Sequence, residues 1–126
     1  MPHTFTVKVY YEDTDAGGVV YYANYLRFME RARTEYLSEL GVNVAELHSA
    51  GQLLVVTHID IDYRRPARLG ETLEVTTELE EAKTVRVTLR QRISRQGTEL
   101  IDAHLTFACV DRDGKPQRVP AVFSGP

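Results

Sequence analysis

Hydrophobic and polar residues alternate along much of the chain. This period of two is typical of strands that bury one face against a core. The alternation covers residues 5–11, 55–63, 72–79, 85–93 and 101–109. In residues 55–63 it places Val55, Thr57 and Ile59 on one face. The sequence therefore predicts five strands.

Residues 21–40 follow a different pattern. Apolar side chains recur every three or four positions from Leu26 to Leu40, with charged residues between them, which is typical of an amphipathic helix. Gly41 then occupies the position where a glycine commonly ends a helix. We predict one long helix of about nineteen residues, a rod of roughly 28 Å, followed by a loop through Gly51.

Short turns separate the later strands, at residues 68–70, 81–83, 96–97 and 113–114. Parallel pairing needs a crossover of a dozen or more residues, so the strands are predicted to form an antiparallel meander. One face is apolar and can be covered by the helix, whereas Thr, Glu and Arg on the other face exclude a two-sheet sandwich. We expect an α+β fold in which a sheet of about five strands wraps around one long helix, in a single domain over residues 1–126.

Composition and charge narrow the class of protein. The chain has 126 residues, 43% hydrophobic and 26% charged, as in ordinary globular proteins. The net charge of -3 gives no overall attraction to nucleic acid. Neither a signal peptide nor a membrane-spanning helix is indicated. Cys109 has no second cysteine to pair with, which fits a reducing compartment. We expect a cytoplasmic protein that neither binds nucleic acid nor inserts into a membrane.

The common nucleophile and metal motifs are missing from the sequence. It contains no G-x-S-x-G turn, and its four histidines do not have the spacing of metal ligands. Cys109 shares its strand face with Leu105 and Phe107, so we interpret it as a buried hydrophobic residue and not as a catalytic thiol. We expect no metal site.

Residues with the potential for chemistry are concentrated in YEDTDAGGVVYYANY, residues 11–25. This segment brings three carboxylates and two glycines to a helix start, where free N–H groups and a partial positive charge stabilise anions. A carboxylate beside an oxyanion site suits acyl transfer. Alternatively, Asp13 or Asp15 only caps a turn while the glycines permit a positive φ. The residues alone leave both interpretations open.

The stretch VYYEDTDAGGVVYYANYLRFMERARTEYL resembles the signature of the hot-dog-fold acyl-CoA thioesterases, in the YbgC-type (Tol-Pal-associated) and 4-hydroxybenzoyl-CoA thioesterase-like branch. DYRRPARLGETLEV and KPQRVP follow in the order and spacing of that family. The resemblance implies a hot-dog fold that hydrolyses the thioester of a small or medium acyl-CoA without a cofactor. It also implies a homodimer or homotetramer with active sites where subunits meet.

Carried over position by position, the resemblance makes Asp15 the general base or nucleophile and Asp13 a structural residue. The N–H of Tyr22 would polarise the thioester oxygen, and Tyr22 stands where YbgC-type members usually have His. The residues expected to shape the approach to the site are Gly17, Gly18 and Val19.

Further residues are expected to contact the two ends of the substrate. Tyr25, Val56 and Thr57 are candidates for binding the acyl group. Arg64, Arg65 and Lys83 are candidates for binding the CoA phosphates. His58 shares a strand face with Asp60 and Asp62, where an ion-paired or interface histidine is expected.

Two alternative functions stay open. A hot-dog dehydratase of acyl thioesters needs a positioned acid-base His, and none falls in the Asp15 segment. A non-catalytic acyl-CoA-binding protein with the same fold is disfavoured by the presence of Asp15. Under any of the three functions, residues 55–63 have the character of an edge strand suited to pairing with another chain.

Overall fold

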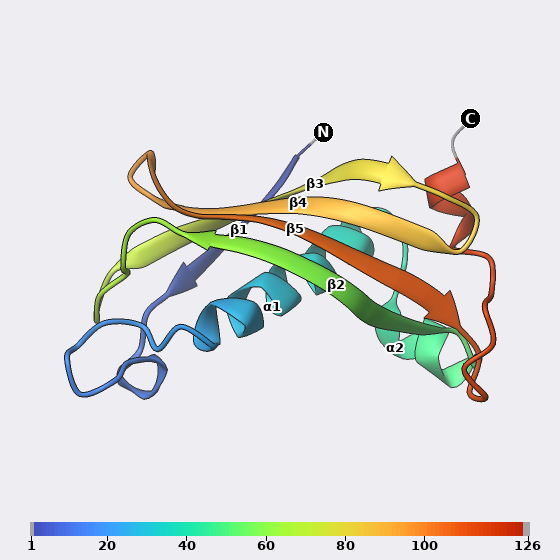
Figure 1. Cartoon of the computed structure of the whole chain (residues 1–126), viewed down its shortest axis with the longest axis horizontal. Coiled ribbons are helices and arrows are strands. Elements are labelled where there is room, and N and C mark those ends of the chain that lie inside the picture. The colour runs from blue at the N-terminus through green and yellow to red at the C-terminus, as the bar shows by residue number, and fades with distance from the viewer. Residues whose placement is uncertain (1, 125–126) are drawn as a thin grey trace.

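A five-stranded antiparallel sheet forms the main layer of the protein in the computed structural model, which describes residues 2–124 (Figure 1). The strands are β1 (His3–Lys8), β2 (Leu53–Tyr63), β3 (Thr72–Ala82), β4 (Arg86–Arg95) and β5 (Thr98–Val110). Their order in the sheet is β1-β3-β4-β5-β2, and each neighbouring pair is antiparallel. The predicted α+β class and the number of strands are confirmed.

The position of β2 differs from the predicted meander. Only β3, β4 and β5 are successive neighbours, while β2 pairs with β5 at the edge of the sheet. The connection from β2 to β3 therefore crosses the end of the sheet, and the prediction of a simple meander was wrong. Turn length cannot distinguish a hairpin from such a crossing, because both join antiparallel strands. The expected edge position of residues 55–63 is confirmed.

A β-bulge at Thr57 shifts the alternation within β2. The register sets Val56 opposite Phe107 and leaves Thr57 without a partner residue. Directly opposed residues point to the same face of a sheet, so Val56 lies on the face of the buried Phe107. The sequence pattern had placed Val55 and Thr57 there. One inserted residue reverses the parity of every residue before it, and a period-two pattern cannot detect it.

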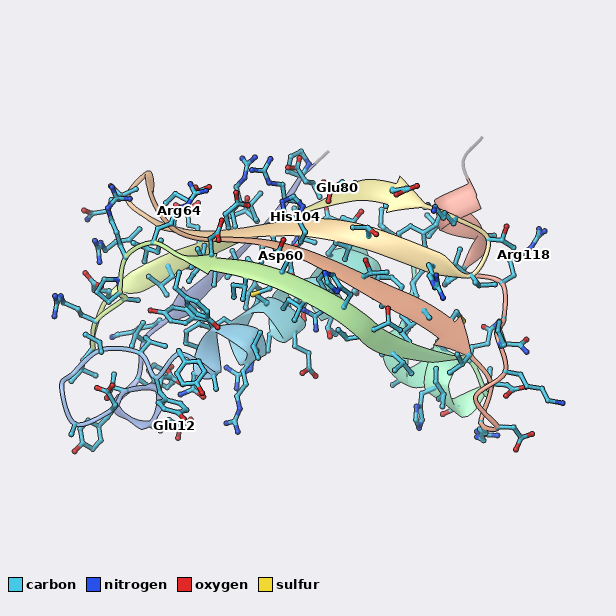
Figure 2. All side chains as sticks on the ribbon, viewed as in Figure 1. Glu12, Asp60, Arg64, Glu80, His104 and Arg118 are labelled. Carbon is cyan, nitrogen blue, oxygen red and sulfur yellow. The ribbon has the colours of Figure 1, made fainter. Side chains whose placement is uncertain are left out.

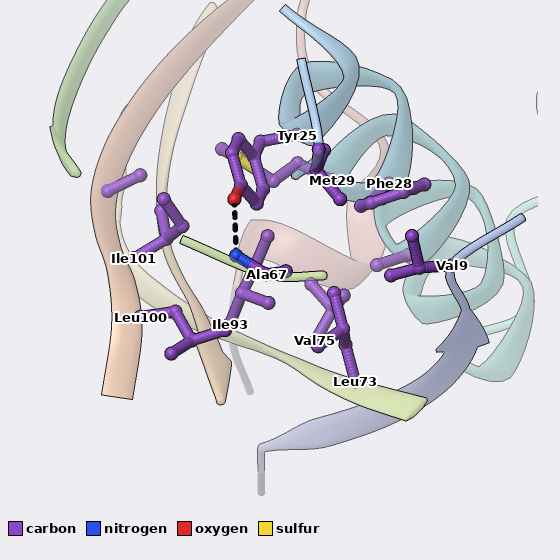
Figure 3. Packing of buried hydrophobic residues seen from close by; sticks show 13 residues of the cluster. Val9, Tyr25, Phe28, Met29, Ala67, Leu73, Val75, Ile93, Leu100 and Ile101 are labelled. Carbon is purple, nitrogen blue, oxygen red and sulfur yellow. Dashed lines mark hydrogen bonds between the residues drawn. The ribbon is translucent and has the colours of Figure 1, made fainter. Parts of the chain in front are cut away.

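Helix α1 (Asn24–Glu39) covers one face of the sheet, as predicted (Figure 1). Figure 3 shows Phe28 and Met29 of this helix among Val75, Ile93 and Ile101 of the sheet, all shielded from solvent. Each large apolar side chain buried in this way contributes about 1.5 to 3 kcal/mol relative to an exposed one. The core therefore lies between α1 and one face of the sheet.

Helix α1 begins three residues later than predicted. The N–H of Tyr21 and the side-chain amide of Asn24 both donate to the carbonyl of Asp13, at 3.0 and 2.9 Å. These bonds hold residues 21–23 in a turn ahead of the helix. The end of the helix is as predicted, because Gly41 follows it with a φ of +88°.

The region read as a loop contains a second helix, α2 (Val44–Ser49). The side-chain oxygen of Asn43 accepts the N–H of Glu46 at 3.0 Å and caps this helix. Asn followed three residues later by Glu is a helix-start signal, but six residues are too few to show helical periodicity. Two short 3-10 helices cover Tyr11–Asp13 and Ala121–Ser124.

Candidate active site

The segment between β1 and α1 folds back on itself at one end of the sheet. The N–H of Asp15 donates to the carbonyl of Val19 at 2.9 Å, and Gly18 has a φ of +77°, a conformation that favours glycine. The N–H of Val20 donates to the carbonyl of Ala67 at 2.8 Å. The loop is therefore tied to the β2–β3 connection, at the end where Figure 2 labels Glu12 and Arg64.

The carboxylate of Asp15 is exposed and lightly held. Its Oδ1 accepts the N–H of Gly17 at 2.8 Å, and a Cβ at Gly17 would lie only 3.3 Å from that oxygen. Its other oxygen accepts no hydrogen bond, and no cation lies within 4.0 Å of it, in residues 2–124. One oxygen of Asp15 is thus left to solvent or a ligand.

The neighbouring Asp13 is half-buried, and both its side chain and its carbonyl form hydrogen bonds within the loop. Its Oδ2 accepts the N–H of Tyr10 at 2.8 Å and closes the first turn of the 3-10 helix. Its carbonyl accepts the two bonds from Tyr21 and Asn24 that delay the start of α1. Each carboxylate thus accepts one backbone N–H, but Asp13 is half-buried and its carbonyl anchors the helix start, whereas the carboxylate of Asp15 is exposed.

Free backbone donors lie at the start of α1. The N–H groups of Asn24 and Leu26 donate to the carbonyls of Tyr21 and Ala23, at 2.8 and 3.2 Å. Those of Tyr22 and Ala23 have no acceptor within the described chain. Unpaired N–H groups at a helix start attract an oxyanion. The Tyr22 N–H is therefore available for the role predicted for it.

Three tyrosine rings pack together beside the helix start. The Tyr63 ring lies 6.3 Å from that of Tyr22 and 5.7 Å from that of Tyr25, centroid to centroid. The Tyr63 hydroxyl donates to the Tyr22 carbonyl at 3.4 Å. Tyr63 was not among the predicted site residues, and its place after the bulge gave no sequence signal.

Tyr25, predicted to contact the acyl group, lies in the core. Its hydroxyl accepts the N–H of Ala67 at 2.9 Å, the dashed line in Figure 3. Burial raises the pKa of Tyr25 and keeps the phenol protonated. This bond fixes α1 to the β2–β3 connection, so Tyr25 positions the loop that carries Asp15.

A groove of about 290 Å³ opens between α1, α2 and the first half of β2. Its lining residues are Glu30, Arg33, Thr34, Leu37, Val44, Leu54, Val56 and Phe107. The predicted Val56 is on its wall, while the hydroxyl of Thr57 donates to the Thr106 carbonyl at 3.4 Å. Arg33 lies ten positions beyond the N-cap Ala23, about 15 Å along the helix. Within one chain, the groove and Asp15 are therefore separate.

Two of the predicted CoA-binding cations, Arg64 and Arg65, lie at the Asp15 end of the sheet (Figure 2). Arg64 forms an ion pair with Glu99 and approaches Asp102 at 3.6 Å. Arg65 donates from Nη1 to the Glu99 carbonyl at 3.0 Å. Arg64 is thus largely engaged by carboxylates, and Arg65 keeps more of its donors free.

Lys83, the third predicted cation, lies at the opposite end of the sheet, in the β3–β4 hairpin. Its Nζ is 3.7 Å from Glu81 and both groups are exposed. A hollow of about 340 Å³ beside it is lined by Ala82, Lys83, Thr84, Arg118 and Phe123. Arg118, which Figure 2 labels, was not among the predicted cations.

The outer face of the sheet is charged, and several of its carboxylates form ion pairs. Arg90 donates to both oxygens of Asp102, at 3.1 and 2.9 Å, which holds the pKa of Asp102 below its ordinary range. His104 lies 2.7 Å from Glu80, and Figure 2 labels both residues. This face presents a network of ion pairs.

Residues 2–124 give little support for a metal site, a membrane-spanning helix or a reactive cysteine. This part of the chain contains no group of three or more His, Cys, Asp and Glu side chains that could hold a metal ion. None of its helices is long and apolar enough to cross a membrane. Burial raises the pKa of Cys109, which disfavours the reactive thiolate.

Comparison with known proteins places this geometry among thioesterases. The model of the thioesterase-like superfamily matches residues 9–125. The acyl-CoA thioesterase YbgC of Haemophilus influenzae is 46% identical over 95% of this chain and 93% of its own. The acyl-CoA thioester hydrolase YbgC of Escherichia coli is 41% identical over 90% of this chain and 87% of its own. The crystal structure of a probable thioesterase from Bartonella henselae has a TM-score of 0.91 at 35% identity, covering 95% of this chain and all of that one.

Proposed function

Because the chain belongs to the thioesterase-like superfamily, we propose that it hydrolyses acyl-CoA thioesters to a free acid and CoA. One observation carries the proposal: a carboxylate with a free oxygen, Asp15, lies in the same short loop as the unpaired N–H groups at the start of α1. A thioester carbonyl has little resonance stabilisation, so a base and an oxyanion site are sufficient for its hydrolysis.

The chemistry follows from these two groups. The carbonyl oxygen of the thioester accepts the N–H of Tyr22, which stabilises the negative charge that develops on it. In one route, the carboxylate of Asp15 removes a proton from the attacking water, the C–S bond breaks, and the CoA thiolate takes up that proton. In the other route, the carboxylate attacks the carbonyl carbon and the C–S bond breaks, which leaves an acyl anhydride on Asp15 and the CoA thiolate. Water then hydrolyses the anhydride, regenerates the carboxylate and supplies the proton to the thiolate. No step requires a cofactor.

The edge strand supports an oligomer with sites between subunits. Val55, Val56 and Tyr63 of β2 are exposed although they are large and hydrophobic. An unpaired edge with apolar side chains favours pairing with the same strand of a second copy. The active protein is thus a homodimer through β2, or a homotetramer of two such dimers.

The exposed cations support binding of CoA phosphates. Lys83 and Arg118 line one hollow, and Arg65 lies near the Asp15 loop. A local cationic site suits a protein whose net charge is -3. The buried, reduced Cys109 agrees with activity in the cytoplasm.

The test is release of CoA, followed with a free-thiol reagent, from a panel of short aliphatic, long aliphatic and aromatic acyl-CoAs. The wild type should release thiol from at least one class, and Asp15→Asn should not. Binding of acyl-CoA without thiol release would instead indicate a binding protein. Loss of water from a 3-hydroxyacyl-CoA without thiol release would indicate a dehydratase.

A further inference from the structure

Arg33 differs from the other arginines of the protein. Four arginines in residues 2–124 are partly buried: Arg33, Arg90, Arg92 and Arg95. The last three each lie within 4.0 Å of a carboxylate. Arg33 has no such partner in the described chain, and burial lowers its pKa. A partly desolvated guanidinium without a counter-ion is a favourable site for an anion.

The guanidinium of Arg33 is held in place with donors to spare. Its Nη1 donates to Oε1 of Gln91 at 3.1 Å. Gln91 is itself fully buried and donates to the Met29 carbonyl and the Thr77 hydroxyl, both at 2.9 Å. The remaining donors of Arg33 have no acceptor in residues 2–124, and none of them is sealed from the surface. The charge is therefore preorganised.

The surroundings of Arg33 fit the tail of an acyl group. It shares the groove of about 290 Å³ with the apolar side chains of Leu37, Leu54, Val56 and Phe107. This volume is at the low end for small-molecule sites. An apolar wall with one fixed cation suits a short hydrocarbon chain that ends in a negative group.

The second copy brings this groove to the reacting carbonyl. In a two-fold dimer built on β2, the two edge strands run antiparallel, so the start of β2 in one copy faces the end of β2 in the other. The groove wall at Leu54 and Val56 of one copy then lies toward the end of β2 that carries Tyr63 in the other. Tyr63 contacts Tyr22 at the helix start.

We propose that Arg33 binds a carboxylate at the far end of the acyl group, so that the protein prefers short ω-carboxyacyl-CoA thioesters to methyl-terminated ones. The inference rests on the proposed thioesterase function and names its substrate class. Glu30, which also lines the groove, lies beyond ion-pair distance of Arg33 and weakens the attraction for an anion without neutralising the site.

The test compares adipyl-CoA with hexanoyl-CoA, which share a six-carbon chain and differ at its end. The wild type should have the higher kcat/KM for adipyl-CoA. Arg33→Met should lower kcat/KM for adipyl-CoA by about 10-fold to 100-fold, because a charge-assisted hydrogen bond is lost. Its kcat/KM for hexanoyl-CoA should stay within about threefold. Arg33→Lys, which keeps the charge, should give an intermediate value for adipyl-CoA.

Two control variants separate charge in the groove from charge elsewhere. Arg31→Met removes an exposed arginine of α1 and should leave both substrates unchanged. Glu30→Gln should raise kcat/KM for adipyl-CoA by about twofold to fivefold, because a repelling carboxylate is removed. A wild type that prefers hexanoyl-CoA, or an Arg33→Met variant that loses both substrates equally, would overturn the proposal. Equal loss of activity on both substrates would mean that Arg33 only positions Gln91.

A binding readout keeps the proposal separate from the hydrolase assignment. Free adipate should raise the Tm of the wild type, and it should have no effect on Arg33→Met. If no acyl-CoA is hydrolysed while adipate still stabilises only the wild type, the proposed function fails and the anion site stands. If acyl-CoAs are hydrolysed, but adipate does not raise the Tm and adipyl-CoA is not preferred to hexanoyl-CoA, the proposed anion site is wrong and the hydrolase assignment stands.

Discussion

Two aspartates of this protein, Asp15 and Asp102, carry the same chemical group in opposite settings. Asp102 lies on the outer face of the sheet, largely buried, and accepts both hydrogen bonds of a bidentate pair from Arg90. Asp15 lies in an exposed loop and accepts one backbone N–H. A carboxylate whose oxygens are all occupied stabilises the fold, whereas one with a free oxygen beside unpaired donors can meet a substrate.

The cations also differ in how many partners the fold gives them. Arg64 is engaged by Glu99 and Asp102, whereas Lys83 has only a distant, exposed partner in Glu81. Residue type alone therefore does not separate these charged side chains. The number of partners that the fold supplies to each of them does.

The largest effect is expected for Asp15→Asn. Asn keeps the size of the side chain and can still accept the N–H of Gly17, but it cannot act as a base or nucleophile. We expect kcat to fall by about 10²-fold or more while the free energy of unfolding changes by less than about 0.5 kcal/mol. Steady-state thiol release and urea unfolding of the same preparation measure the two quantities.

Asp13→Ala supplies the matched control in the same loop. It removes the acceptor for the Tyr10 N–H and should lower the free energy of unfolding by about 1 kcal/mol. Its kcat should fall far less than that of Asp15→Asn. Near wild-type turnover in Asp15→Asn with an inactive Asp13→Ala would reverse the assignment within the loop.

Asp13 and Asp15 also show how much of the candidate site can be predicted from the sequence. The D-T-D run lies between a predicted strand and a predicted helix, so the proximity of Asp15 to a helix start follows from local order along the chain. The resemblance to a family distinguished Asp15 from Asp13, and the structure adds that Asp15 is exposed while Asp13 is half-buried and anchors the helix start through its carbonyl. Local contacts of this kind are within reach of sequence reasoning.

Contacts that depend on strand register cannot be predicted from the sequence in this way. Asp102 meets Arg90 because β4 and β5 pair so that Arg92 stands opposite Asp102, which brings Arg90 alongside it. No local signal sets that register. The bulge at Thr57 also depends on this register, which is why Val56 was assigned to the wrong face. Tyr63 was missed because its packing against Tyr22 and Tyr25 joins segments that are far apart in the sequence.

A second, smaller effect is expected for Asp102→Asn, with the opposite signature to Asp15→Asn. The substitution leaves Arg90 with one neutral acceptor in place of a bidentate carboxylate. We expect a loss of about 1 to 3 kcal/mol in the free energy of unfolding, with kcat within about twofold of wild type. Urea unfolding and thiol release again measure both. An Asp102→Asn variant that keeps its stability but loses turnover would break the contrast between the two carboxylates.

The third prediction applies the contrast to the cations. Lys83→Ala and Arg65→Ala should raise KM for acyl-CoA by about threefold to tenfold with little change in kcat, because contacts with the CoA phosphates are equal in the ground and transition states. Arg64→Ala should instead lower stability, since Glu99 and Asp102 each lose one of their two cationic partners. Initial rates over a range of acyl-CoA concentrations give KM and kcat separately. An unchanged KM in both Lys83→Ala and Arg65→Ala would place the nucleotide elsewhere.

The smallest effect concerns acid stability. The hydrogen bonds from Arg90 hold the pKa of Asp102 in the folded protein below its ordinary value of about 3.9. A carboxylate with a lowered folded pKa stabilises the protein at pH values above the unfolded pKa, and this contribution is lost as the pH falls through the folded pKa. The stability difference between wild type and Asp102→Asn should therefore be constant from about pH 8 to pH 5 and shrink by about 1 kcal/mol below about pH 4. A difference for Asp102→Asn that stays constant down to pH 3 would mean that Arg90 stabilises the sheet through packing alone and not through the charge of Asp102.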